Sequence, residues 1–426
     1  MTKEQTNNRL ALTVITTLFF MWGFLTSLND ILIPHLKAVF KLNYTQSILI
    51  QFTFFSAYFI MSIPSGWLVS KFGYQKGLVM GIIVSAIGAI LFYPAASFAS
   101  YPLFLGALFV LATGITVLQV GANPYVAVLG DPDTSSSRLN LAQAFNSLGT
   151  TIAPYLGGLI ILGGTVLSAS QLHKMSAHQQ AAYKATQAQS VQIPYLGLAG
   201  ILILLAILVG FFNLPQIRDT EHDDQSDGDH SFWDVLSYRH VRYGVVAIFV
   251  YVGAEVSIGS FLVNFIKLPS IGNMSGTDAS AYVSFYWFGA MVGRFIGSAL
   301  LQKVDARKLL AIFAMIALGL VTTGILSAGM VAAWALVLVG LFNSIMFPNI
   351  FTLAIKDLGN MTSSASSLLV MAIVGGAVIP LLEGVLADNI GLHLAFVLPL
   401  ACYLYIIFYG FNGSKVITAP AKNRME

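Results

Sequence analysis

Long apolar stretches separated by short polar segments run through this sequence. A helix needs about 20 apolar residues to cross the hydrocarbon core of a bilayer. Stretches of that kind occur at 10–40, 45–70, 76–95, 101–129, 138–163, 193–213, 240–267, 279–302, 308–328, 330–356, 362–387 and 393–413. They do not alternate apolar and polar positions as the strands of a membrane barrel do. The pattern therefore predicts an all-α membrane protein with twelve transmembrane helices, several of which have ends blurred by Pro and Gly.

Two polar stretches interrupt this pattern. Residues 214–239 contain the acidic string RDTEHDDQSDGDH, which is typical of a solvated linker. Residues 165–192 are rich in Gln, Ala, Ser and His and are expected to form an external loop. We therefore expect an N-terminal six-helix half at 1–213, an acidic cytoplasmic linker at 214–239 and a C-terminal six-helix half at 240–426.

The two halves resemble each other at an offset of about 230 residues. Matched positions in the first and second half are Gly23 and Gly253, Lys37 and Lys267, Pro124 and Pro348, and Pro154 and Pro380. Repeated halves of parallel topology are typical of alternating-access transporters, which bind their substrate between the halves near the membrane midplane. The sequence thus predicts two pseudo-symmetric halves with a transport function.

The composition narrows the class of protein further. Hydrophobic residues make up 57% of the 426 residues and charged residues 9%, whereas soluble globular domains carry about 25% charged residues. So few charges cannot cover a water-exposed surface, which excludes a soluble enzyme, a disordered chain and a nucleic-acid binder. The net charge of +3 does not suggest a polyanionic partner. The single Cys402 excludes a disulfide framework and a cysteine metal cage.

The distribution of Lys and Arg predicts the orientation, because cytoplasmic loops carry an excess of both. With a cytoplasmic N-terminus, fifteen of these residues lie inside, five lie outside and Arg294 lies within a span. The first span is too long for the apolar core of a cleavable signal peptide. We therefore expect both termini in the cytoplasm.

The first predicted span carries a carboxyl group on a polar face. Trp22, Thr26 and Asp30 recur at helical spacing and share that face, with Asn29 adjacent to Asp30. A charged group at mid-bilayer costs at least about 2.5–3.5 kcal/mol, so such groups usually mark a pathway or a partner. Asp30 can alternate between protonated and charged forms as it closes off from water or meets it, as a proton-coupled carrier requires. A bound metal cation would use the same oxygens, and a structural hydrogen bond is the plainer alternative.

Amides line the neighbouring spans. The polar residues at helical spacing are Thr116, Gln119 and Asn123 in the fourth span, and Asn140, Gln143, Asn146 and Ser147 in the fifth. Amides both donate and accept hydrogen bonds, so several of them around one cavity suit a polyhydroxylated ligand better than an apolar one. Individually, each amide can equally serve as a hydrogen bond between helices, worth about 0.6 kcal/mol on average.

Three further ionisable groups lie in the second half. Glu255 is either a second coupling carboxylate or the partner of Arg294, for which we expect a structural role beside a carboxylate. Glu383 lies near a predicted helix end, where its side chain is expected to reach water.

Four strings carry a resemblance to a known family. They are WGFLTSLNDILIPHLK, LQVGANPYVAVLG, RLNLAQAFNSLG and NSIMFPNIFTLAIKDLG. Together they resemble the fucose:proton symporter family of the major facilitator superfamily, and look closest to its glucose/galactose-type branch. The resemblance extends from about residue 15 to 410. It implies the major facilitator fold and a twelve-helix carrier that imports monosaccharides with a cation across a bacterial inner membrane.

The resemblance also implies residue roles. Asp30 matches the acidic residue of the first span that takes part in proton coupling, and Gln143 and Asn146 match residues near the sugar. Gln119 departs from the family, because the fucose transporter has a glutamate there and Gln cannot titrate. The candidate sugar ligands are Trp22, Thr26, Gln119, Asn123, Gln143, Asn146 and Asn343.

The coupling ion stays open between H⁺ and Na⁺. The candidate coupling residues are Asp30, Asn29 and Glu255, of which Glu255 could compensate for the missing glutamate. If Na⁺ is carried, Asp30, Gln119 and Asn123 are the expected ligands, because hard cations prefer oxygen. The expected partners are a monosaccharide and membrane lipid, with no nucleic acid, and we expect a monomer.

Other function classes agree less well with the sequence. A proton-coupled antiporter for drugs or small solutes, from the same superfamily, would share Asp30 and the repeat, but the amide-rich faces favour a sugar. A membrane enzyme is not indicated, because the sequence has no His-x-x-Glu-His, Gly-x-Ser-x-Gly or phosphate-loop motif. The two-half repeat also argues against a channel.

Overall fold

The computed structural model describes residues 10–27, 44–161, 175–176, 178–179, 191–212, 214–215 and 232–416. It is built from helices, as predicted. They divide into two compact units, one within Met1–Ala122 and Phe145–Pro215 and the other within Asn123–Ala144 and Gln216–Glu426.

The first half of the chain contributes six described helices longer than one turn. They are Leu10–Ser27, α2 (Tyr44–Phe72), α3 (Tyr74–Ser97), α4 (Tyr101–Val128), α5 (Ser135–Ile161) and α8 (Gln192–Phe211). A short 3₁₀ turn at Pro132–Thr134 joins α4 to α5.

The described residues of the second half of the chain form nine α-helices, some of them pieces of one span. They are α9 (Arg239–Ile266), α10 (Gly276–Leu300), α11 (Ala306–Leu326), α12 (Gly329–Asn343), α13 (Met346–Ala354), α14 (Thr362–Met371), α15 (Gly375–Ile390), α16 (Leu392–Ala395) and α17 (Val397–Phe408). Shorter 3₁₀ segments lie at Phe232–Ser237, Gly359–Met361 and Ala372–Val374, and a π-helical turn at Tyr409–Gly413.

Among the residues that the structure describes, ten helical segments are long and apolar enough to cross a membrane. The helices α5 and α10 are not among the ten but coincide with the predicted spans 138–163 and 279–302. Of the predicted span 10–40, the structure describes Leu10–Ser27. In the region predicted as a linker, the structure describes a 3₁₀ helix at Phe232–Ser237.

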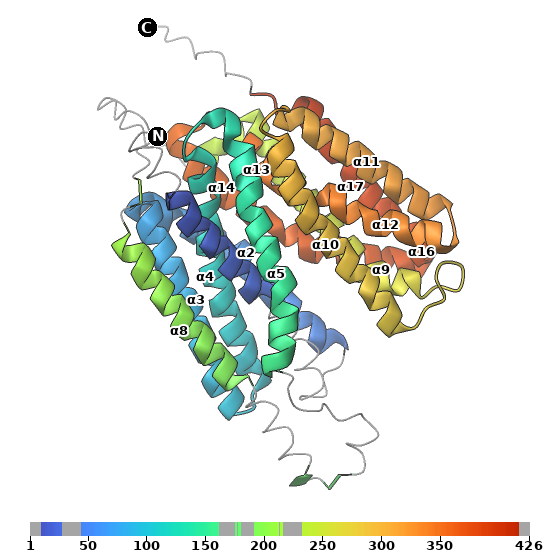
Figure 1. Cartoon of the computed structure of the whole chain (residues 1–426), viewed down its shortest axis with the longest axis horizontal. Coiled ribbons are helices and arrows are strands. Elements are labelled where there is room, and N and C mark those ends of the chain that lie inside the picture. Colours follow the sequence, from blue (N-terminus) through green and yellow to red (C-terminus); the bar gives the residue numbers. More distant parts are fainter. Residues whose placement is uncertain are drawn as a thin grey trace. The chain divides into compact units, whose positions relative to one another are not determined.

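Small residues bring the helices of the first unit into close contact. Figure 1 shows α3, α4 and α8 side by side. A Cβ atom built on Gly114 of α4 would lie 2.3 Å from the backbone nitrogen of Ser85 on α3, and one on Gly88 of α3 would lie 2.3 Å from that of Leu111 on α4. Only glycine fits at such distances, which is how membrane helices achieve tight packing in lipid.

The predicted repeat recurs as a packing contact inside each unit. A Cβ atom on Gly149 of α5 would lie 2.2 Å from the carbonyl oxygen of Phe20 on the first helix. A Cβ atom on Gly375 of α15 would lie 2.0 Å from the carbonyl oxygen of Phe249 on α9. Each glycine stands five residues before the matched prolines Pro154 and Pro380. The corresponding helices of the two halves therefore pack through the same kind of contact.

Two spans that the sequence predicts as continuous are interrupted. The span 330–356 is divided into α12 and α13 by a turn at Ser344 and Ile345. Proline lacks an N–H and clashes with the carbonyl four residues before it, which places the break just ahead of Pro348. The span 362–387 is divided into α14 and α15 by the 3₁₀ turn Ala372–Val374. A 3₁₀ turn inside a helix often marks a hinge.

Residues 123–144, at the end of α4 and the start of α5, group with the second unit. Hydrogen bonds between buried side chains hold this segment there. The Ser136 hydroxyl lies 2.6 Å from that of Thr352, and Asn140 Nδ2 donates to Asn349 Oδ1 at 2.9 Å. The division of the sequence into halves at residues 213 and 240 remains a prediction.

Candidate functional site

The first described helix carries two of the candidate sugar ligands. Trp22 is 5% exposed, and its ring lies 4.3 Å from that of Phe19, centroid to centroid. The Thr26 hydroxyl donates to the Trp22 carbonyl at 2.9 Å, a bond within its own helix. This hydroxyl can still accept a bond from a ligand. Asn29 and Asp30, the principal coupling candidates, lie outside the described residues, and their roles stay predictions.

Gln119, the residue that departs from the family pattern, has a defined partner. Its Nε2 donates to the Tyr58 hydroxyl on α2 at 2.8 Å, and both side chains are buried. The amide and the phenol form a neutral pair in an apolar setting. Neither needs a change of charge to bind a sugar hydroxyl, so this pair suits substrate recognition rather than proton transfer. Tyr58 was not predicted as a partner, because it lies 61 residues away in the sequence.

Asn146, predicted as a sugar ligand, bonds the first helix. Its Nδ2 donates to the Phe19 carbonyl at 2.9 Å. A Cβ atom built on Gly23 would lie 2.1 Å from the backbone carbonyl oxygen of Asn146. The bond to Phe19 joins α5 to the first helix, so Asn146 provides a hydrogen bond between helices, which was the alternative to sugar binding. The amide oxygen is left to accept from a ligand.

Asn123 and Gln143 are brought together inside the second unit. Gln143 Nε2 donates to Asn123 Oδ1 at 3.4 Å, a long bond that joins α5 to α4. Asn123 is fully buried, and its Nδ2 has no hydrogen-bond partner among the described residues. A buried donor without a partner costs about 1–3 kcal/mol, so a ligand oxygen placed there would relieve that cost.

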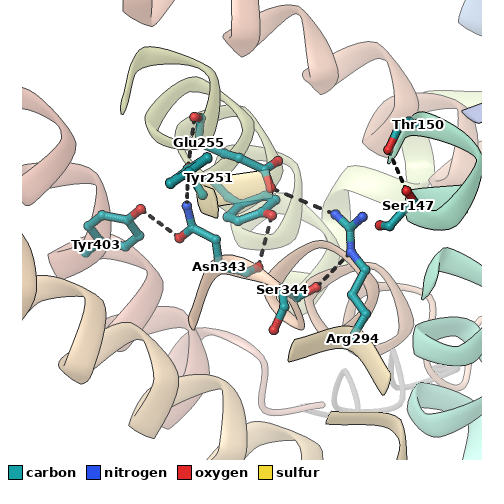
Figure 2. Close-up of polar contacts among 9 residues, drawn as sticks. Ser147, Thr150, Tyr251, Glu255, Arg294, Asn343, Ser344 and Tyr403 are labelled. Atoms are coloured by element: carbon teal, nitrogen blue, oxygen red, sulfur yellow. Dashed lines mark hydrogen bonds and ion pairs between the residues drawn. The ribbon is translucent and has the colours of Figure 1, made fainter. Parts of the chain in front are cut away.

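The break between α12 and α13 creates polar backbone groups that the second unit satisfies with side chains (Figure 2). The carbonyl of Ser344 has no helical donor four residues on, because Pro348 stands there. Arg294 Nε on α10 donates to this carbonyl at 3.2 Å. The Tyr251 hydroxyl on α9 donates to the carbonyl of Asn343 at 3.0 Å. Side chains from two helices, α9 and α10, therefore bond the backbone at the break between α12 and α13.

The Asn343 side chain is the centre of this cluster. Tyr403 of α17 donates to its Oδ1 at 2.7 Å, and its Nδ2 donates to the Tyr286 hydroxyl of α10 at 2.8 Å. Tyr286 donates in turn to the Glu255 carbonyl at 3.1 Å. Asn343 was predicted, whereas the three tyrosines were missed. The spacing of four between Tyr251 and Glu255 on one helix was the signal that could have found the first of them.

Glu255 pairs with Arg294, as one of the two alternatives for Glu255 foresaw. Glu255 Oε1 lies 3.8 Å from Arg294 Nη2, with 11% and 13% of the two side chains exposed. A buried pair of this kind is costly to form and very costly to break by removing one partner. The pairing makes Arg294 a structural cation and leaves the coupling role of Glu255 a prediction.

Glu383 corrects an expectation. The structure buries it completely on α15, so the prediction that it reaches water from a helix end is wrong.

The described residues contain no group of three or more His, Cys, Asp or Glu side chains placed to hold a metal ion. Of the ligands expected for Na⁺, Gln119 bonds Tyr58 and Asn123 bonds Gln143, both through neutral groups. Asp30, the third, lies outside the described residues.

Comparisons with known proteins agree with this architecture. The model of the Major Facilitator Superfamily matches residues 14–378. A glucose/galactose transporter of Brucella abortus biovar 1 (strain 9-941) is 53% identical over 414 residues, covering 97% of this chain and 96% of that protein. The L-fucose-proton symporter of Escherichia coli (strain K12) is 37% identical over 409 residues, covering 95% and 93%.

A solved structure agrees over the same length. A crystal structure of a variant of the E. coli fucose:proton symporter FucP superposes with a TM-score of 0.89 at 36% identity, covering 96% of this chain and 100% of that one. The fold predicted from the sequence is confirmed: the chain is a multi-pass membrane transporter and not an enzyme. It belongs to the fucose:proton symporter family of the major facilitator superfamily.

Proposed function

We propose that this transporter imports a hexose of the glucose/galactose type together with protons by alternating access. The observation that carries the substrate class is that buried amides pair with phenols or amides inside otherwise apolar helices. Gln119 bonds Tyr58 in the first unit, and Asn343 bonds Tyr286 and Tyr403 in the second. Such neutral donors and acceptors match sugar hydroxyls.

The relatives support this assignment and the choice of ion. The Brucella abortus relative, 53% identical, is a glucose/galactose transporter, and the E. coli relative is a fucose-proton symporter. Asp30 is the proposed proton carrier of the first half, with Asn29 beside it and Glu255 as a further candidate. The proposed sugar ligands remain Trp22, Thr26, Gln119, Asn123, Gln143, Asn146 and Asn343.

The proposed setting follows from the charges. Lys and Arg lie mainly on one side of the predicted spans, which supports both termini in the cytoplasm, and the bacterial relatives support an inner-membrane location. We also propose that the monomer is the working unit.

Uptake of radiolabelled hexoses into proteoliposomes tests the assignment. We expect glucose or galactose to accumulate when a pH gradient, acidic outside, is imposed in Na⁺-free buffer, and not when a Na⁺ gradient is imposed at equal pH. Mannose, fucose and N-acetylglucosamine define the selectivity. Accumulation driven by Na⁺ alone would overturn the proton assignment, and no hexose uptake under either gradient would overturn the sugar assignment in favour of the antiporter.

Two variants test whether Gln119 belongs to the hexose-binding site. Gln119→Leu removes the amide that bonds Tyr58 and should weaken hexose binding about tenfold or more, because a lost buried hydrogen bond costs about 1–3 kcal/mol. Asn389→Leu removes an exposed amide on α15 and serves as the matched control. Equal KM values for both variants would exclude Gln119 from the sugar site.

A further inference from the structure

Glu383 is a buried carboxyl group that has no ion pair among the residues the structure describes, and the Ser257 hydroxyl is its polar neighbour. It is 0% exposed, and neither of its oxygens has a hydrogen-bond partner among the described residues. The Ser257 hydroxyl of α9 faces it, and this oxygen also has no partner that meets hydrogen-bond geometry. A charged carboxylate in such a place costs several kcal/mol, so Glu383 is most stable here as the neutral acid.

The other groups around Glu383 do not offer a compensating charge. The Cys402 thiol and the Tyr403 phenol of α17 lie near enough to interact with it electrostatically, and both are neutral. Glu255 of α9 is engaged with Arg294, and His393 of α16 bonds the Gly324 carbonyl through Nε2. Within the described part of the chain, these neighbours of Glu383 include no cation that would hold it permanently ionised.

The packing position does not itself require a carboxyl group. Matching Pro154 with Pro380, and Gly149 with Gly375, places Gly157 at the position of Glu383. The corresponding span of the first half thus has no side chain there. A buried carboxyl group inside a membrane span costs free energy, so its presence indicates a function other than packing.

The span around Glu383 is interrupted. It is divided by the 3₁₀ turn Ala372–Val374, and Pro380 lies one turn before Glu383. Pro380 leaves the carbonyl of Gly376 without its helical donor. Interrupted helices of this kind carry the substrate and ion sites of secondary transporters. Proline and 3₁₀ interruptions are places where helices bend, and a bend here is the route by which water would reach Glu383 in the inference below.

We propose that Glu383, with Ser257 beside it, is an exchangeable proton site of the second unit, separate from Asp30. The carboxylate takes up one proton on one of its oxygens from water on one side, is buried as the neutral acid, and releases the same proton to the other side. The three unpartnered oxygens are too few for a hard metal cation, since Ca²⁺, for example, takes six to eight oxygen ligands. This inference rests on the proposed proton-coupled transport.

The first test counts protons per hexose in lightly buffered proteoliposomes. Glu383→Gln keeps the shape of the side chain and removes the titrating group, so we expect about one proton fewer per hexose than in the wild type. Asp388→Asn, which removes an exposed carboxylate from the same helix, should leave the ratio unchanged. Hexose counterflow at equal pH on both sides reports whether the variant is folded. An unchanged ratio in a folded Glu383→Gln variant overturns the proposal.

The second test does not depend on hexose transport or on the variant folding. Dicyclohexylcarbodiimide reacts with protonated carboxyl groups in apolar surroundings, and mass spectrometry locates the adduct. We expect modification of Glu383 in the wild-type protein that slows as the pH is raised. Absence of the adduct, or protection by Na⁺ at constant pH, overturns the proton site. Should no hexose be carried, this labelling still decides the role of Glu383, so the two failures are distinguishable.

Discussion

Replacing Arg294 by Met should destabilise the transporter by about 3–5 kcal/mol, because it leaves the buried Glu255 carboxylate without its partner. Arg294 also donates to the Ser344 carbonyl that Pro348 leaves free, so the break between α12 and α13 loses its donor as well. The loss is measured as a lower midpoint of thermal unfolding in detergent, or of denaturant unfolding.

A double variant separates the two contributions. In Arg294→Met/Glu255→Gln the uncompensated charge is gone, so we expect most of the lost stability to return, while the share due to the Ser344 hydrogen bond stays lost. Arg242→Met, which removes an exposed arginine of α9, is the matched control and should change the midpoint little. If the double variant is no more stable than Arg294→Met, the ion pair is not the source of the effect.

Adding a single methyl group at Gly375 should destabilise the second unit by about 3 kcal/mol or more. The new Cβ atom would lie 2.0 Å from the Phe249 carbonyl oxygen, so α15 and α9 must move apart, and overpacking of a helix contact is costly. Unfolding of purified Gly375→Ala, together with the yield of monodisperse protein, measures the effect.

The same substitution elsewhere on α15 provides the control. At Gly384 the new Cβ atom would meet only the Phe261 ring, at 3.6 Å, and Gly384→Ala should be neutral or stabilising by about 0.5–1 kcal/mol through backbone entropy. Gly149→Ala, against Phe20 in the first unit, should resemble Gly375→Ala. Equal stability of Gly375→Ala and Gly384→Ala would contradict the described helix contact.

The fold was predictable because the bilayer imposes it. A span must be apolar over its whole length and must satisfy its backbone internally, so α3, α4 and α9 could be placed from hydropathy alone. The interruption before Pro348 was harder to place, because proline is tolerated in membrane helices where neighbours satisfy the freed carbonyls. Those neighbours, Tyr251 and Arg294, lie 50 or more residues away in the sequence.

The candidate site was predictable as a set of residue types but not as a set of contacts. Helical spacing identified Gln119, Asn123 and Gln143, because a polar residue in an apolar span often marks a functional site. Spacing could not find Tyr58 as the partner of Gln119, because tyrosine is common in apolar spans. The prediction for Glu383 was wrong for a related reason: distance to a helix end does not show what packs over that end.

The movement of protons on addition of hexose tests the central claim most directly. Proteoliposomes containing the purified wild-type protein are suspended in weakly buffered, Na⁺-free medium, and the external pH is followed when glucose or galactose is added. The account predicts that the medium becomes more alkaline in proportion to the hexose taken up, and less so for Asp30→Asn, which lacks one titrating group. Hexose uptake that leaves the external pH unchanged, or that requires Na⁺, would contradict it.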